Sequence, residues 1–141
     1  MSQNPSVVTI FKNNLATGTP SPRNQVIPPW VRLTHGNSPD SWVTFVNATA
    51  CNAELRFPAP LFDGLSTGFD AGGTAFYFVR IAAGTYVELH AAQKNNTFFG
   101  DKYQIVFDAT QPGCATVPPI GSLGTVDQYV TPGDDPHVII G

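Results

Sequence analysis

Residues 41–47 read SWVTFVN, and this stretch decides the fold class of the chain. Val43 and Phe45 alternate with residues that fall on the opposite face of an extended segment, because successive side chains of a strand point to opposite sides. Aromatic and β-branched residues also favour a half-buried strand over a helix. The stretch therefore predicts a sheet with one face in a hydrophobic core.

The same alternation recurs on both sides of this stretch. Short runs bounded by Gly, Pro, Asn and Asp predict further strands. These runs are Val7–Phe11, Trp30–Thr34, Cys51–Phe57, Thr74–Ile81, Thr85–Ala91, Lys102–Asp108, Thr125–Val130 and His137–Ile140. The sequence therefore predicts an all-β sandwich of about 7–9 strands.

The segments between these runs predict turns and loops. Residues 1–24 combine the first strand with a polar loop that contains Pro20 and Pro22, so we expect an irregular N-terminal region. Ala82-Ala83-Gly84 predicts a hairpin turn between its flanking strands. One helical turn is expected around Leu61–Leu65.

Length and composition indicate one domain over residues 1–141. Charged residues make up 12% of the chain, and its seven Lys and Arg are scattered, so neither nucleic acid nor an anionic membrane surface is an expected partner. No apolar run is long enough for a membrane span. The first residues lack the pattern of a signal peptide, while the Lys-poor, Asn/Thr/Gly-rich composition favours an extracytoplasmic location.

The order of several motifs resembles the cupredoxin family. Pro29–Thr34 followed by Trp42–Asn47 matches the family's early pair of strands, which ends in Phe-x-Asn. Ile81–Val87 matches its apolar-x-x-Gly-x-x-apolar segment, Gly100–Phe107 its late Tyr-containing strand, and Asp135–Ile140 its last strand. The resemblance covers residues 25–141 and implies a Greek-key β-sandwich.

The residues that hold copper in this family do not match. A type 1 centre needs two imidazoles, one thiolate and a weak axial ligand. Cys51 stands where the first His is expected, Phe107 stands at or close to the Cys position, and the chain has no Met beyond Met1. We therefore expect neither type 1 copper nor another cofactor.

The resemblance places both cysteines near the end of the sandwich where copper would lie. It leads to the hypothesis that Cys51 and Cys114 form a disulfide across the vacated site. Two buried free thiols are the alternative. A rearranged copper or zinc site that combines Cys51, Cys114 and a histidine is the alternative function.

The histidines offer little chemistry by themselves. His35 lies in an expected turn, and His137 opens the last strand, where a structural role is expected. Glu88 and His90 should share the outer face of a strand, where they supply two metal ligands at best. No Gly-x-Ser-x-Gly elbow is present, so an enzyme is not expected.

Aromatic residues crowd the middle of the chain. Phe62, Phe69, Phe98 and Phe99 fall in or near expected loops, where they either form a binding platform or pack under a loop. The sequence thus favours a non-catalytic binding or structural module. Its partner is a protein, a small molecule or another copy of the chain.

Overall fold

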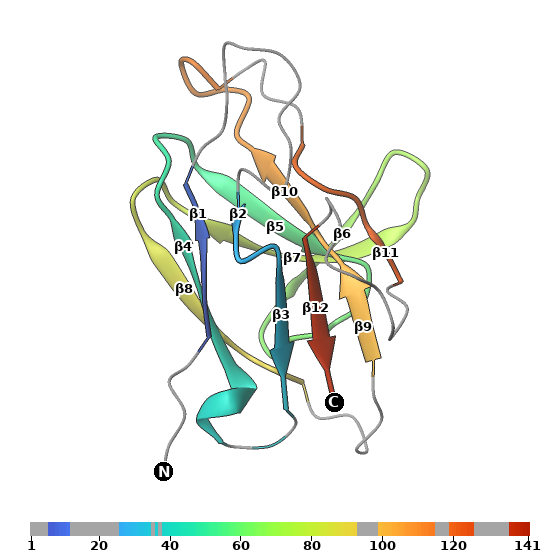
Figure 1. The fold of residues 1–141 in the computed structure, drawn as a ribbon. Coiled ribbons are helices and arrows are strands. Elements are labelled where there is room, and N and C mark those ends of the chain that lie inside the picture. Colours follow the sequence, from blue (N-terminus) through green and yellow to red (C-terminus); the bar gives the residue numbers. More distant parts are fainter. Residues whose placement is uncertain are drawn as a thin grey trace.

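The computed structural model describes residues 6–11, 26–34, 36, 38–92, 99–114, 119–125 and 136–141. Its regular structure consists of strands, with one short 3-10 turn at Pro39–Ser41. The strands form three four-stranded sheets, here called A, B and C (Figure 1). The predicted all-β sandwich is therefore confirmed, whereas the cupredoxin Greek key stays a prediction.

Sheet A contains the SWVTFVN stretch and has the order β2-β1-β4-β8. Its strands are β2 (Val26–Ile27), β1 (Ser6–Ile10), β4 (Trp42–Asn47) and β8 (Tyr86–His90). Strands β1 and β4 are parallel, and the other pairs are antiparallel. The inward side chains are buried, as the alternation predicted; they include Val8, Ile10, Val43 and Phe45.

Sheet C is antiparallel throughout and has the order β10-β5-β7-β6. Its strands are β10 (Gln104–Phe107), β5 (Ala53–Phe57), β7 (Ala75–Ile81) and β6 (Ser66–Phe69).

An aromatic cluster fills the core between sheets A and C. Phe45 from β4 packs against Phe57 from β5, and Phe62 and Tyr103 complete the cluster. Neighbouring ring centroids lie 5.2–6.4 Å apart. The outer faces of the two sheets therefore point away from each other.

Sheet B has the order β11-β9-β12-β3 and joins the other two sheets. Its strands are β11 (Gly124–Thr125), β9 (Phe99–Lys102), β12 (His137–Ile140) and β3 (Trp30–Leu33). Strand β2 continues into β3 across the Ile27–Pro28 bond, and β9 continues into β10 across Tyr103. The corner at Tyr103 divides the strand expected at Lys102–Asp108, and β2 lies outside the expected strands, so the structure contains more strand segments than the sequence predicted.

The helical turn expected around Leu61–Leu65 is wrong. Phe62 instead forms a bridge with Ala91, and backbone hydrogen bonds tie the segment to the end of β8. Leu61 and Phe62 are buried, and β6 begins four residues after Phe62. Tertiary pairing thus replaces the local helical preference.

The hairpin expected at Ala82-Ala83-Gly84 is also wrong. A turn is present, since Thr85 N–H donates to the Ala82 carbonyl at 3.0 Å and Gly84 has a φ of 72°. However, β7 belongs to sheet C and β8 to sheet A, so the turn crosses between layers.

No helix within the described ranges has the length and apolarity that a membrane span needs.

Candidate functional site

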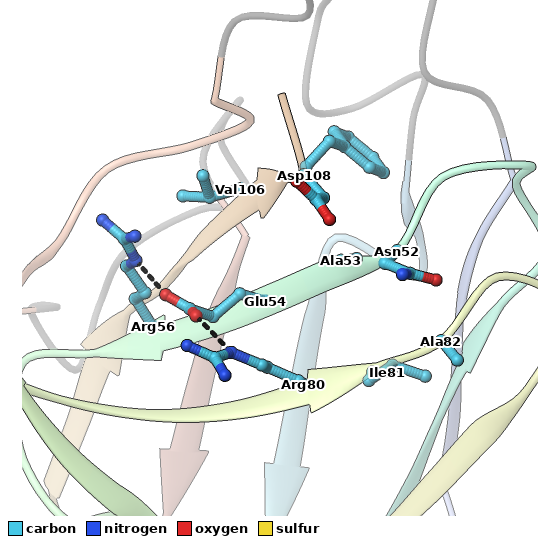
Figure 2. Close-up of a pocket in the computed structure, with 10 residues that line it drawn as sticks. Asn52, Ala53, Glu54, Arg56, Arg80, Ile81, Ala82, Val106 and Asp108 are labelled. Atoms are coloured by element: carbon cyan, nitrogen blue, oxygen red, sulfur yellow. Dashed lines mark hydrogen bonds and ion pairs between the residues drawn. The ribbon is translucent and has the colours of Figure 1, made fainter. Parts of the chain in front are cut away.

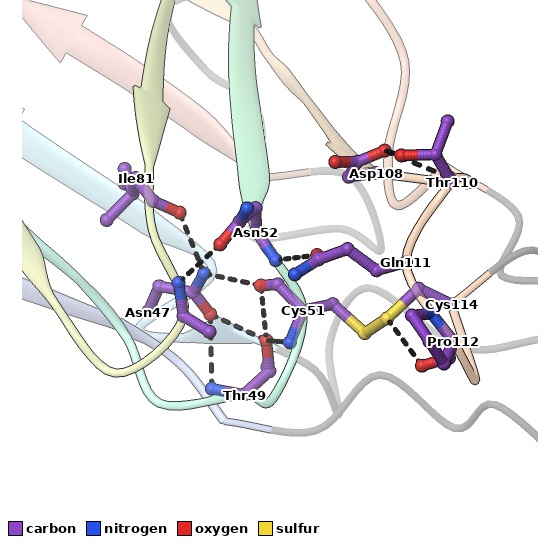
Figure 3. Close-up of a disulfide and its surroundings, with 11 residues drawn as sticks. Asn47, Thr49, Cys51, Asn52, Ile81, Asp108, Thr110, Gln111, Pro112 and Cys114 are labelled. Carbon is purple, nitrogen blue, oxygen red and sulfur yellow. Dashed lines mark hydrogen bonds between the residues drawn. A yellow bond between two sulfur atoms is a disulfide. The ribbon is translucent and has the colours of Figure 1, made fainter.

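A disulfide joins Cys51 and Cys114, at the end of the sandwich where the sequence resemblance led us to expect it (Figure 3). Cys51 precedes β5, Cys114 follows β10, and both side chains are buried. The predicted disulfide is thus confirmed, and the alternative of free thiols is wrong. With both sulfurs bonded, neither is a thiolate ligand, and the described residues contain no group of three or more His, Cys, Asp or Glu side chains that could hold a metal ion.

Asn47 is the residue at this end that the sequence analysis missed. Its side-chain amide donates to the carbonyl oxygens of Cys51 at 2.8 Å and Ile81 at 3.0 Å. Its side-chain oxygen accepts from the backbone N–H and the hydroxyl of Thr49. Asn47 is fully buried and joins the end of β4, the disulfide loop and the end of β7 (Figure 3). The one sequence signal was its place at the end of the Phe-x-Asn motif.

His90 lies at the opposite end of β8 from the crossing turn and holds three segments together. Its Nδ1 lies 2.7 Å from an Asp63 carboxylate oxygen, and its Nε2 lies 2.6 Å from the Gly36 carbonyl oxygen. The Trp42 ring packs against the imidazole, with the ring centroids 4.8 Å apart. His90 thus pairs with Asp63 and not with Glu88.

The partners of His90 determine its protonation. Both partner atoms are oxygens that accept hydrogen bonds, so this geometry favours the imidazolium, in which both ring nitrogens donate. The hydrogen bond that His90 donates to Asp63 raises the pKa of His90 above 6.5, against the opposing effect of burial. An imidazolium has no lone pair for a metal ion or for taking up a proton. While protonated, His90 is therefore a structural cation.

The other predicted site residues are spread through the molecule. His137 is buried and stacks with Trp30 at a centroid distance of 6.3 Å, while His35 lies outside the described residues. Among the four aromatic candidates, Phe62 is only 2% exposed, which fits core packing, and Phe69 on β6 is 68% exposed. Phe99 begins β9, and Phe98 lies outside the described ranges.

The outer face of sheet A carries an exposed apolar surface. Register places Ile27, Thr9, Val46 and Tyr86 side by side in one row across all four strands. Ile27 is 58% exposed and Tyr86 is 62% exposed, at the two ends of this row. Val7 lies in the next row on this face, opposite Thr44, and Trp42 lies one row farther on, opposite His90; both Val7 and Trp42 are exposed. We call this surface the apolar face; its apolar members are Val7, Ile27, Trp42, Val46 and Tyr86.

Comparison of the chain with protein-family models, with curated proteins and with solved structures finds no significant match. The likeness to cupredoxins therefore rests on the order of sequence motifs alone. The disulfide end, the His90 cluster and the exposed surfaces of the sheets are the features that bear on function.

Proposed function

We propose that the protein is a non-catalytic, cupredoxin-like binding module without type 1 copper, which assembles with a second copy of itself through the apolar face. The observation that carries this proposal is the row of Ile27, Thr9, Val46 and Tyr86 on the outer face of sheet A. Large side chains at both ends of this row are more than half exposed. Contiguous exposed apolar surface of this kind is typical of an interaction site.

The position of the charges supports a contact between two copies. A two-fold interface brings the same patch of both subunits together, so charges near its centre face like charges. Strands β1, β2 and β4 carry no charged residue. Glu88 and His90 share the outer face of β8 with Tyr86, opposite Thr44 and Trp42, and β8 is the edge strand of sheet A. The centre of the apolar face can therefore pack on its own copy without buried charge repulsion.

The geometry around His90 supports the non-catalytic part of the proposal. His90 donates from both ring nitrogens, and the disulfide occupies both cysteine sulfurs. The protonated imidazole is thus not a base, and the disulfide leaves neither Cys51 nor Cys114 as a nucleophilic thiolate. Contact through a surface is the function that this arrangement favours.

Light scattering coupled to size-exclusion chromatography tests the proposal. With rising protein concentration, the measured mass should increase from the chain mass of 15.1 kDa towards twice that value. Tyr86→Lys and Ile27→Lys should remain monomeric, because each places a cation in the interface. Thr67→Lys on exposed β6 is the control and should dimerise like the wild type. A wild type that stays monomeric, or a control that dissociates equally, overturns the proposal.

A further inference from the structure

A groove of about 620 Å³ runs along β5 on the outer face of sheet C (Figure 2). The apolar face lies on a different sheet, sheet A. Strands β7 and β10 flank the groove. Its polar walls include Glu54, Arg56, Arg80 and Asp108, and Val106 lies among them. Charges of both signs therefore face one open space.

Glu54 positions the two arginines at one end of the groove. Arg80 Nε donates to Glu54 Oε1 at 3.0 Å, and Arg56 Nε donates to Oε2 at 2.5 Å (Figure 2). Each carboxylate oxygen thus serves one guanidinium through its Nε. The terminal Nη nitrogens of both arginines have no partner within the described part of the chain. These are the atoms that form paired hydrogen bonds with a carboxylate.

Two phenylalanines hold the guanidinium groups in place. The Arg56 guanidinium lies 4.6 Å from the centroid of the Phe76 ring, and that of Arg80 lies 5.2 Å from the centroid of Phe78. Contacts of this kind favour a cation over the aromatic face. The two arginines share one glutamate, so the arginine end of the groove has a net charge of +1. It suits one carboxylate better than a dianion.

Asp108 supplies the opposite charge at the other end of the groove. Its Oδ1 accepts from both the backbone N–H and the hydroxyl of Thr110, while its Oδ2 has no partner among the described residues. The hydrogen bonds from Thr110, and to a smaller extent the positive charge of Arg80, lower the pKa of Asp108, so it is ionised at neutral pH. Val106 lies opposite Glu54, and Asp108 follows two residues later, which places it about 7 Å farther along the groove.

We propose that this groove binds a zwitterionic ligand of the ω-amino-acid class, whose carboxylate lies between Arg56 and Arg80 and whose ammonium group lies against Asp108. The half-buried Val106 side chain contacts the aliphatic spacer between the two charges. A free ω-amino acid and a lysine at the C-terminus of a peptide share this chemistry. The site lies on sheet C and does not depend on self-association through sheet A.

Titration of the full chain with small probes, followed by NMR of the β5, β7 and β10 amides, tests this proposal. 6-Aminohexanoate should give saturable shifts and bind about tenfold more tightly than hexanoate or hexylamine, because each of these lacks one charge. Nα-acetyl-lysine, which represents a C-terminal lysine, should bind as well as 6-aminohexanoate if the natural ligand is a peptide. It should bind less well if the groove accepts only free ω-amino acids.

Single substitutions measure what each end of the groove contributes to ligand binding. Arg80→Gln should weaken 6-aminohexanoate and hexanoate alike, whereas Asp108→Asn should weaken 6-aminohexanoate to the affinity of hexanoate and leave hexanoate unchanged. Arg32→Gln on β3 is the control for lost positive charge and should change neither affinity. Absence of saturable shifts in the wild type, or equal binding of 6-aminohexanoate and hexanoate, overturns the proposal. Neither result bears on the light-scattering test of self-association through the apolar face.

Discussion

The side-chain amide of Asn47 donates a hydrogen bond of 2.8 Å to the carbonyl oxygen of Cys51. This contact joins the last residue of β4 to the loop that carries the disulfide. The same amide also reaches Ile81 at the end of β7, on the opposite layer of the sandwich. Asn47 therefore ties sheet A to sheet C at the end of the sandwich that carries the disulfide.

Replacing Asn47 with Ala should lower the free energy of unfolding by about 3 kcal/mol, since buried carbonyls lose their donors. Urea unfolding followed by fluorescence measures this change. Asn52→Ala is the matched control: Asn52 is exposed, and its side chain accepts one hydrogen bond, from Ala83 N–H. The control should cost less than about 1 kcal/mol. Equal losses in both variants would contradict the role assigned to Asn47.

The disulfide should contribute to stability chiefly by restricting the unfolded chain. Cys51 and Cys114 are 63 residues apart, and a closed loop of this length corresponds to about 4 kcal/mol in the chain-entropy model. The double variant Cys51→Ser/Cys114→Ser should unfold at correspondingly lower urea concentration. Thiol labelling of denatured, unreduced wild type should find no free thiol, and two labelled thiols per chain would refute the disulfide.

His90 should make stability depend on pH. Its pKa in the folded protein is raised above 6.5, mainly by Asp63, so the stabilisation is complete below pH 6.5 and is lost as pH rises through the folded pKa. The free energy of unfolding should therefore fall over this interval in the wild type, relative to His90→Gln. NMR titration of Asp63→Asn should show a lower pKa for His90. Identical pH profiles of wild type and His90→Gln would contradict this prediction.

Tyr103 lies fully buried in the aromatic cluster, and its hydroxyl has no hydrogen-bond partner among the residues that the structure describes. Burial also raises the pKa of this phenol far above its ordinary value of 10. Tyr103→Phe should thus stabilise the protein by about 1 kcal/mol, because it removes an unpaired polar group without changing the ring. Thermal unfolding measures the change. A destabilised variant would reveal a partner for the hydroxyl.

The strands were predictable from the sequence because their alternation reflects one buried face. Val43 and Phe45 on β4, and Tyr103, Ile105 and Phe107 around β10, all point into the core as the pattern indicates. Strand pairing was not predictable in the same way. The turn at Ala82–Gly84 has the same local chemistry whether its strands pair with each other or enter different sheets. Only contacts with β4 and β5 decide between these arrangements.

The surfaces proposed here depend on register between strands far apart in sequence. Ile27 and Tyr86 lie in one row because β1 and β4 stand between their strands. Glu54 likewise meets Arg80 only through the pairing of β5 with β7. Phe62 was a binding candidate in the sequence because it lies in a loop, but long-range packing buries it. Local sequence carries no information about these juxtapositions.

Self-association through the apolar face can be located residue by residue in amide NMR spectra of the wild type recorded over a dilution series. Resonances of β1, β4 and β8 should shift with concentration, with Val46 and Tyr86 among the largest changes. Resonances of β5 and β7 should stay constant. Spectra without concentration dependence, or shifts confined to sheet C, would contradict assembly through the apolar face.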